Sequence, residues 1–273
     1  MRYSPYPVAS ISWNVVRTLF HQCSAHRRYK GLKIRVFESE HDAGLYAAAL
    51  AERVVHETEC PVLGLATGRT VLPFYQALVR LEHCGLDLSR CITINLDEYV
   101  GLEARHPQSY HQFMRENLFD DIGIEPENTY IPNGAAINLD VECARYDEIL
   151  SRHPIDFQLL GIGVNGHVGF NEPNHLLQSK THVVHLTPET IAHNAKFFQS
   201  LDEVPKSAIT MGVQAILQAK QIVLMAFGEE KADIVARAIQ GEVRTDIPAS
   251  ILQLHRDVTI VLDEASARVL LKK

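Results

Sequence analysis

The alternation of short apolar runs with longer segments of helical periodicity is the feature of this sequence that most restricts its fold. The apolar runs are rich in β-branched residues and lie at Ile34–Phe37, Val62–Leu65, Ile92–Leu96, Phe157–Leu160, Ile222–Ala226 and Val258–Leu262. The helical segments between them lie at Asp42–His56, Val71–His83, Leu139–Ser151 and Glu229–Ile239. Continuous apolar strands joined by crossover helices form parallel sheets that are covered on both faces. The sequence therefore predicts an α/β fold with a Rossmann-like, doubly wound, mostly parallel sheet and helices on both faces.

Length and composition predict a single folded domain. A chain of 273 residues that is 46% hydrophobic can bury one substantial core, and no repeat or Pro/Gly/Ser-rich linker divides it. We expect residues 33–273 to form this domain and residues 1–32 to form an N-terminal arm of uncertain order. The first 37 residues contain basic but no acidic side chains. That composition fits a transit peptide, a solvated arm or an overlong gene start, and we favour the latter two.

Charge and cysteine usage restrict the partners and the compartment. A net charge of -7 argues against nucleic-acid binding, because phosphate neutralisation needs a basic surface. A small sugar phosphate needs only a few local cations. The five cysteines show no C-x-x-C spacing, which predicts reduced thiols in a cytoplasmic protein and no zinc site. No apolar run approaches 18 residues, so no membrane partner is expected.

A glycine-rich turn directly follows the Phe157–Leu160 run. It reads Leu160-Gly-Ile-Gly-Val-Asn-Gly-His-Val-Gly-Phe-Asn-Glu-Pro173. Glycines let the backbone approach a ligand closely, and open α/β sheets bind ligands at the carboxyl ends of their strands. Asn165, His167 and Glu172 would then lie together at the mouth of a cleft. A structural turn with a hydrogen-bonded histidine is the alternative that these residues alone leave open.

The segment after Val62–Leu65 has the character of a phosphate-binding loop. Thr67, Gly68, Arg69 and Thr70 stand directly before a predicted helix, whose free amide groups and partial positive charge suit an anion. The segment matches neither a Walker P-loop nor a dinucleotide-binding motif. Thr70 could instead serve only as the helix N-cap.

Two adjacent carboxylates, Asp97 and Glu98, follow the Ile92–Leu96 run. Neighbouring residues of an extended chain point to opposite sides, so one carboxylate can face a cleft while the other is held structurally. Asp97 is the better candidate base, because a partly desolvated carboxylate can take a proton from a carbon beside a carbonyl. An aspartate that caps the following turn is the alternative.

Lys231 lies in the first turn of the helix predicted after Ile222–Ala226. The helix dipole disfavours a cation there unless an anion lies nearby, and a phosphate would supply that anion. A solvated lysine compensated by Glu229 and Glu230 is the alternative.

Taken in order, these segments resemble the glucosamine-6-phosphate deaminase family, also called glucosamine-6-phosphate isomerase. The resemblance covers about residues 33–265. Its strings are Leu65-Ala-Thr-Gly-Arg-Thr70, Asn95-Leu-Asp-Glu-Tyr-Val-Gly-Leu102, His106-Pro-Gln-Ser-Tyr110, Gly161-Ile-Gly-Val-Asn-Gly-His-Val-Gly-Phe-Asn-Glu-Pro173, Val204-Pro-Lys206 and Leu252-Gln-Leu-His255.

The resemblance implies conversion of D-glucosamine 6-phosphate and water into D-fructose 6-phosphate and ammonia without a cofactor. Asp97 matches the base that moves a proton between C2 and C1 through an enolamine-type intermediate. His167 matches the group that opens the pyranose ring, oriented by Glu172 and the residue at position 165. An imidazole can accept and donate a proton near neutral pH, and a carboxylate partner fixes its tautomer.

The chain departs from the family pattern at three places. Asn165 stands where other members have aspartate, so this position carries no charge. Lys196 stands where the family usually has a phosphate-binding arginine, which keeps the charge but loses the bidentate fork. The segment after Glu172 lacks the pattern of allosterically activated members, and we expect no activation by N-acetylglucosamine 6-phosphate. A homo-oligomer is possible.

Three other functions stay open. A galactosamine-6-phosphate deaminase differs mainly in how the enzyme recognises one hydroxyl of the sugar. A 6-phosphogluconolactonase shares the glycine-rich turn, although Phe170-Asn-Glu-Pro173 and the Asp97-Glu98 pair favour the deaminase. A sugar-phosphate sensor of a transcription regulator would need a DNA-binding motif, for which the residues before the first strand are too few and too irregular.

Overall fold

The computed structural model describes residues 23–272 and contains one large, mostly parallel sheet. Its strand order is β1-β2-β11-β10-β7-β3-β4-β6, in which only β1 is antiparallel to its neighbour. The strands are β1 (Ala25–Tyr29), β2 (Leu32–Phe37), β3 (Val62–Leu65), β4 (Ile92–Asn95), β6 (Thr129–Tyr130), β7 (Phe157–Gly161), β10 (Gln221–Ala226) and β11 (Val258–Asp263). Every predicted apolar run forms a strand of this sheet, with Leu96 lying just beyond β4, which confirms the predicted fold class.

The sheet begins earlier in the chain than we expected. Ala25–Tyr29, assigned above to the N-terminal arm, pairs as β1 with β2, with Ala25 opposite Val36. The three central residues of β1 are exposed, so it has no apolar run by which the sequence could have revealed it. The part of the arm before residue 23 lies outside the described residues.

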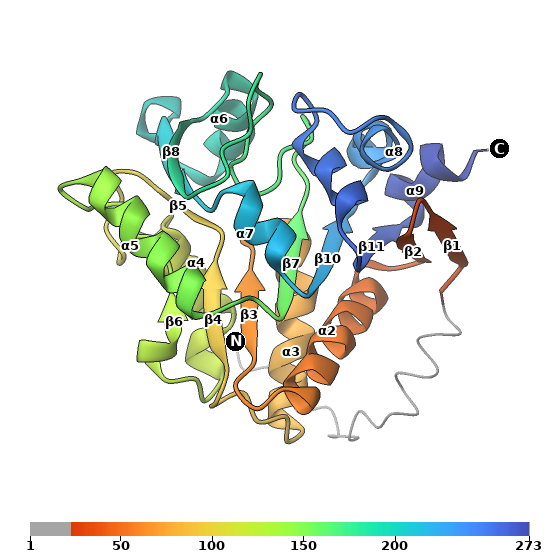
Figure 1. The fold of residues 1–273 in the computed structure, drawn as a ribbon, viewed down its shortest axis with the longest axis horizontal. Coiled ribbons are helices and arrows are strands. Elements are labelled where there is room, and N and C mark those ends of the chain that lie inside the picture. Colours follow the sequence, from red (N-terminus) through yellow and green to blue (C-terminus); the bar gives the residue numbers. More distant parts are fainter. Residues whose placement is uncertain (1–22, 273) are drawn as a thin grey trace.

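Helices flank the large sheet, whereas α6 (Pro188–Asn194) lies beside a second, smaller sheet (Figure 1). The other helices are α2 (Glu40–Glu57), α3 (Leu72–His83), α4 (Tyr110–Asn117), α5 (Leu139–Arg152), α7 (Val213–Gln218), α8 (Ala232–Gln240) and α9 (Glu264–Leu271). Side-chain caps stabilise the start of several helices. The Ser39 side chain accepts a hydrogen bond from the Asp42 amide at the start of α2, and the Asn138 side chain accepts from the Asp140 and Val141 amides at the start of α5. Helix α2 packs on α3, and α8 packs on α9. No helix within residues 23–272 is long and apolar enough to cross a membrane.

A second, three-stranded antiparallel sheet was absent from the sequence prediction. It has the order β5-β9-β8 and consists of β5 (Asp97–Tyr99), β8 (His182–His185) and β9 (Ser207–Thr210). Two of the three residues of β5 are acidic and β8 begins and ends with histidine, so neither strand has the apolar pattern of a buried strand. This small sheet has its own apolar cluster, which includes Tyr99, Phe170, Leu186 and Ala208.

Leu96 joins the two sheets. Its amide donates to Leu65 of β3 at 3.0 Å, and its carbonyl accepts from the Met211 amide at 2.7 Å. The small sheet with α6 therefore lies beyond the carboxyl ends of β3, β4 and β7 (Figure 1). Open α/β sheets bind their ligands at these ends.

Candidate active site

The turn after β7 holds the His167 ring directly against the backbone of Gly163. The turn is closed by two hydrogen bonds, from Gly163 N to His167 O and from Gly166 N to Gly163 O, both 3.0 Å. A Cβ atom on Gly163 would lie 2.3 Å from Cε1 and 2.5 Å from Nδ1 of His167. Only glycine can stand at this position without displacing the imidazole.

Asn165, His167 and Glu172 come together as the sequence predicted. His167 Nδ1 lies 3.4 Å from Glu172 Oε2. Asn165 donates through Nδ2 to the same oxygen at 2.7 Å and accepts from the His167 amide at 3.1 Å. An amide side chain suits this position, because it can both accept from the peptide N–H and donate to the carboxylate. Position 165 therefore holds Glu172 and the His167 backbone without a charge.

Glu172 stays ionised although it is buried. Burial by itself raises its pKa, but His167, Thr190 and Asn165 more than offset this effect, and the pKa lies below its ordinary value. Thr190 donates to Oε1 at 2.6 Å. An ionised carboxylate beside Nδ1 favours the tautomer with the proton on that nitrogen. The other ring nitrogen, Nε2, is then the one that can accept a proton.

Asp97 is the first residue of β5, opposite Thr210 of β9. It is 5% exposed. Burial and the neighbouring Glu98 raise its pKa to about 8, against an opposing hydrogen bond from the Phe170 amide. Since it pairs within a strand, Asp97 is not the cap of a turn. A carboxyl group that titrates this close to neutrality has the strength of a general base.

The Asp97 carboxylate reaches the His167 turn at Gly169. A Cβ atom on Gly169 would lie 3.1 Å from Asp97 Oδ2 and 3.2 Å from Thr210 Oγ1. Gly169 also has a φ of 57°, a conformation that disfavours other residues. The amide of the next residue, Phe170, donates a hydrogen bond to Thr210 Oγ1 at 3.1 Å. The predicted base therefore lies against the turn that carries the predicted imidazole.

The Thr67–Thr70 loop lies between β3 and α3. Gly68, with a φ of 101°, precedes a short 3-10 turn at Arg69–Val71, and this turn contacts β7 and β10. Thr70 is inside the turn, and neither flanking cap position uses a side chain, so Thr70 is not the helix N-cap. Burial raises the pKa of Tyr110, and a hydrogen bond between the Thr67 side chain and the Tyr110 hydroxyl opposes this rise.

Lys231 is buried, which contradicts the alternative of a solvated surface lysine. It ends a 3-10 turn, Glu229–Lys231, that leads into α8, and its Nζ donates to the Ile162 carbonyl at 2.8 Å. Burial lowers the pKa of Lys231 to about 8, with Glu230 opposing and Lys196 adding to the shift. The effect of Lys196 on this pKa shows that the two predicted phosphate ligands, distant in sequence, interact electrostatically.

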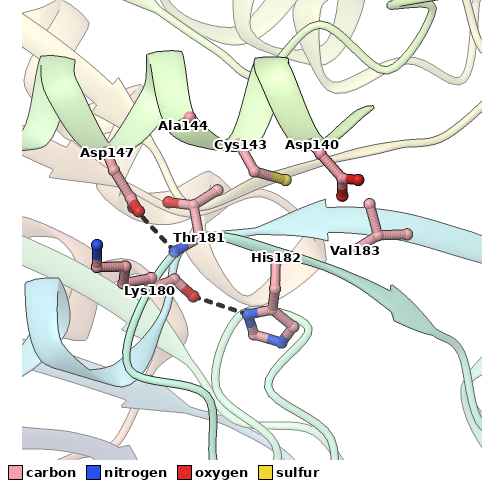
Figure 2. A pocket seen from close by; sticks show the side chains of 8 residues that line it. All are labelled: Asp140, Cys143, Ala144, Asp147, Lys180, Thr181, His182 and Val183. Atoms are coloured by element: carbon pink, nitrogen blue, oxygen red, sulfur yellow. Dashed lines mark hydrogen bonds between the residues drawn. The ribbon is translucent and has the colours of Figure 1, made fainter. Parts of the chain in front are cut away.

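A surface pocket between α5 and β8 lies apart from these groups (Figure 2). In it, Asp147 of α5 accepts a hydrogen bond from the Thr181 amide at 2.9 Å and so fixes the start of β8. None of the candidate residues lines this pocket; its lining consists of Asp140, Cys143, Ala144, Asp147, Lys180, Thr181, His182 and Val183.

Sequence reasoning missed three contributors to the site. Gly163 supports the imidazole, Thr190 holds Glu172, and Thr210 supports the Asp97 turn. Gly163 had a signal, since it stands in the glycine-rich string. The two threonines had none, because they reach the site only through the small sheet and α6.

Comparison with known proteins identifies the family of this chain. A family described as glucosamine-6-phosphate isomerases/6-phosphogluconolactonase matches residues 38–261. A glucosamine-6-phosphate deaminase of Thermoanaerobacter sp. (strain X514) is 46% identical over 241 residues, 88% of this chain and 95% of that protein. One of Clostridium perfringens (strain 13 / Type A) is 49% identical over 226 residues, 82% of this chain and 93% of that protein.

Solved structures share the fold. A monomeric glucosamine-6-phosphate deaminase superposes with a TM-score of 0.84 at 41% identity, covering 86% of this chain and 99% of that chain. A 6-phosphogluconolactonase from Trypanosoma cruzi reaches a TM-score of 0.72 at 20% identity, covering 90% and 99%, and shows the fold alone. Since the family match spans most of the sequence and the relatives align over nearly their whole length, this chain belongs to the glucosamine-6-phosphate isomerase/6-phosphogluconolactonase family.

Proposed function

We propose that this chain is an enzyme that converts D-glucosamine 6-phosphate and water into D-fructose 6-phosphate and ammonia. The observation that carries the proposal is the placement of buried Asp97 against the turn that holds His167 and Glu172. Relatives named glucosamine-6-phosphate deaminase, at 46% and 49% identity, support the same reaction.

Ring opening is the first step. The pyranose ring opens when the O1 hydroxyl loses a proton and O5 gains one. His167 can accept and return this proton through Nε2, while Glu172 stabilises the imidazolium formed in between. Asn165 and Thr190 keep Glu172 in place.

Proton transfer between carbons is the second step. Asp97 takes the proton from C2 while the C1 carbonyl oxygen gains a proton given up by the substrate's ammonium group, which produces an enolamine-type intermediate. Asp97 then returns its proton to C1. The resulting imine at C2 is hydrolysed by water, so that nitrogen leaves as ammonia and C2 becomes the ketone carbon. We assign no cofactor and no metal to these steps, because each of them is a proton transfer or an addition of water.

The phosphate is the third part of the proposal. The Thr67–Thr70 loop, including Gly68 and Arg69, would supply amide and side-chain donors, and Lys196 and Lys231 would supply positive charge. Phosphate binding would also compensate the mutual repulsion of the two lysines.

The direct test is a parallel assay of ammonia and fructose 6-phosphate release from glucosamine 6-phosphate and from galactosamine 6-phosphate. We expect stoichiometric release of both products from the glucosamine substrate. Preference for the galactosamine epimer would identify the alternative deaminase. Hydrolysis of 6-phosphogluconolactone without ammonia release is the outcome that would favour the other branch of the family.

We further propose that the enzyme acts as a monomer in the cytoplasm. A structural relative is described as monomeric, and all five cysteines are free, as in a reducing compartment. Size-exclusion chromatography with light scattering measures the first point.

Gly163→Ala is expected to lower kcat by at least about 10-fold, because the new methyl group would push the His167 ring from its position. The measurement is kcat beside the thermal unfolding midpoint. Gly161→Ala, at the end of β7 two residues earlier, is the matched control, since a Cβ atom there meets nothing within 4 Å. Equal losses in both variants would show that the turn, and not the ring contact, is disturbed.

Lys231→Ala is expected to lower kcat/KM for the phosphorylated substrate by about 10²-fold, the upper part of the roughly 1.5–3 kcal/mol of a hydrogen bond to a charged group. Phosphate binding energy can also hold the sugar in its reactive geometry, so kcat should fall as well. Plain glucosamine is the control substrate. Because Lys231 also donates to Ile162, an equal loss with glucosamine would assign the lysine to the fold of the turn.

A further inference from the structure

The Glu98 carboxylate is fully buried next to Asp97 and ties β5 to the start of α4. Its Oε1 accepts hydrogen bonds from the Tyr99 amide at 2.8 Å and the Tyr110 amide at 3.0 Å. Its Oε2 accepts from the His111 amide at 3.1 Å. The three amides belong to β5 and to the first turn of α4, so a single buried charge fixes these two elements to one another.

His111 makes a second contact with the same carboxylate through its side chain. Nδ1 lies 2.9 Å from Glu98 Oε2, and the imidazole is 30% exposed whereas the carboxylate is 1% exposed. Charge-assisted hydrogen bonds of this length are among the stronger contacts of a buried carboxylate. The His111 imidazole is therefore the member of this pair that contacts solvent.

Two further charged residues near His111, Glu142 and Arg145, lie on α5. Glu142 is buried there and accepts from Arg145 at 2.6 Å and 2.7 Å. Burial raises the pKa of Glu142, but the contacts with Arg145 and the Asn133 amide, with a smaller effect of His111, bring it below its ordinary value. Among residues 23–272, Asp97 and the Tyr99 hydroxyl also interact electrostatically with Glu98, and Glu142 interacts electrostatically with His111.

The charge of Glu98 matters because Asp97 is the preceding residue of β5 and both side chains are buried. After burial itself, the charge of Glu98 is the next cause that raises the Asp97 pKa, so the ionisation of the two carboxyl groups is coupled. A donor on Glu98 delocalises part of its charge and so weakens the repulsion that Asp97 feels. A neutral residue at position 98 would abolish this repulsion.

We propose that Glu98 and His111 are positioning residues for Asp97: buried Glu98 keeps a negative charge beside the base, and His111 limits that charge by donating to it. The pair thus sets the pH range in which Asp97 accepts the C2 proton. The inference rests on the proposed function, since it assigns a role relative to the proposed base.

Two single variants should move the acid limb of the kcat/KM profile in opposite directions. In Glu98→Gln, the amide oxygen can keep the hydrogen bonds from Tyr99 and Tyr110, but the charge is lost. Asp97 then ionises more readily, and the limb should move to lower pH by about one unit. In His111→Leu, Glu98 loses its side-chain donor, so the limb should move to higher pH.

Two further variants complete the design. His111→Asn retains a side-chain donor near the place of Nδ1 and should restore the wild-type limb. In the double variant Glu98→Gln with His111→Leu, the profile should coincide with that of Glu98→Gln, because His111 acts through Glu98.

If the acid limbs do not move, or move in the same direction in both single variants, the inference is wrong. Glu98 would then serve only to cap the start of α4. His111→Leu changes a partly exposed side chain, so it keeps the test decisive even where Glu98→Gln folds poorly. Absence of ammonia release by the wild-type protein would instead contradict the proposed function, and the two failures are thereby distinct.

Discussion

Asp97→Asn should lower kcat by about 10² to 10⁴-fold and leave KM nearly unchanged, which is the usual effect of removing a general base. Asparagine has the same shape as aspartate and can keep the hydrogen bond from the Phe170 amide, but it cannot take the C2 proton. The measurement is the exchange of the C2 proton with deuterated solvent, recorded by NMR beside kcat. Exchange at the wild-type rate in the variant would remove Asp97 from the role of base.

The same variant should be more stable than the wild type. The ordinary pKa of this carboxyl is 3.8 and its pKa in the fold is about 8, so between these values the folded state binds more protons than the unfolded state. Stability therefore falls as pH rises through this range, and the loss is complete above pH 8. Asparagine carries no such cost. At pH 8 or above we expect an unfolding midpoint higher by at least about 2 °C, with the gain vanishing as pH approaches 4.

His167→Gln should lower kcat/KM by about 10² to 10⁴-fold, because glutamine cannot carry the proton between O1 and O5. Groups that act as one unit lose activity non-additively. Adding Glu172→Gln to this variant should therefore cost little more, since Glu172 acts on the reaction through the imidazole. The measurement is kcat/KM for both single variants and the double variant. Losses that multiply would show that the carboxylate and the imidazole act independently.

Six of the eight strands of the large sheet could be predicted because they are short, continuous apolar runs between helical segments. The edge strands β1 and β6 could not, because β1 is largely exposed and β6 has only two residues. The small sheet could not, because β5 and β8 carry charged or titratable residues and depend on pairing with β9, which is distant in sequence. Propensity and periodicity are local signals, whereas this pairing is decided by tertiary contacts.

The grouping of Asn165, His167 and Glu172 followed from a single turn, and for that reason the sequence was sufficient to predict it. The sequence indicated Asp97 as the better candidate base, with the other carboxylate held structurally, but it did not show what holds Glu98. Two of the three amide hydrogen bonds to Glu98 come from α4, an element that was not predicted. The burial of Lys231 was missed because it depends on the Ile162 carbonyl, which belongs to another strand end.

The junction at Leu96 couples the two elements that carry the proposed base and the proposed imidazole. Asp97 belongs to the ladder of the small sheet, and His167 belongs to the turn that follows β7 of the large sheet. Leu96 hydrogen-bonds to Leu65 of the large sheet and to Met211 directly after β9 of the small sheet. Because the Phe170 amide also donates to Thr210 of β9, a substitution that shifts the small sheet is expected to move the Asp97 carboxylate and the His167 turn together.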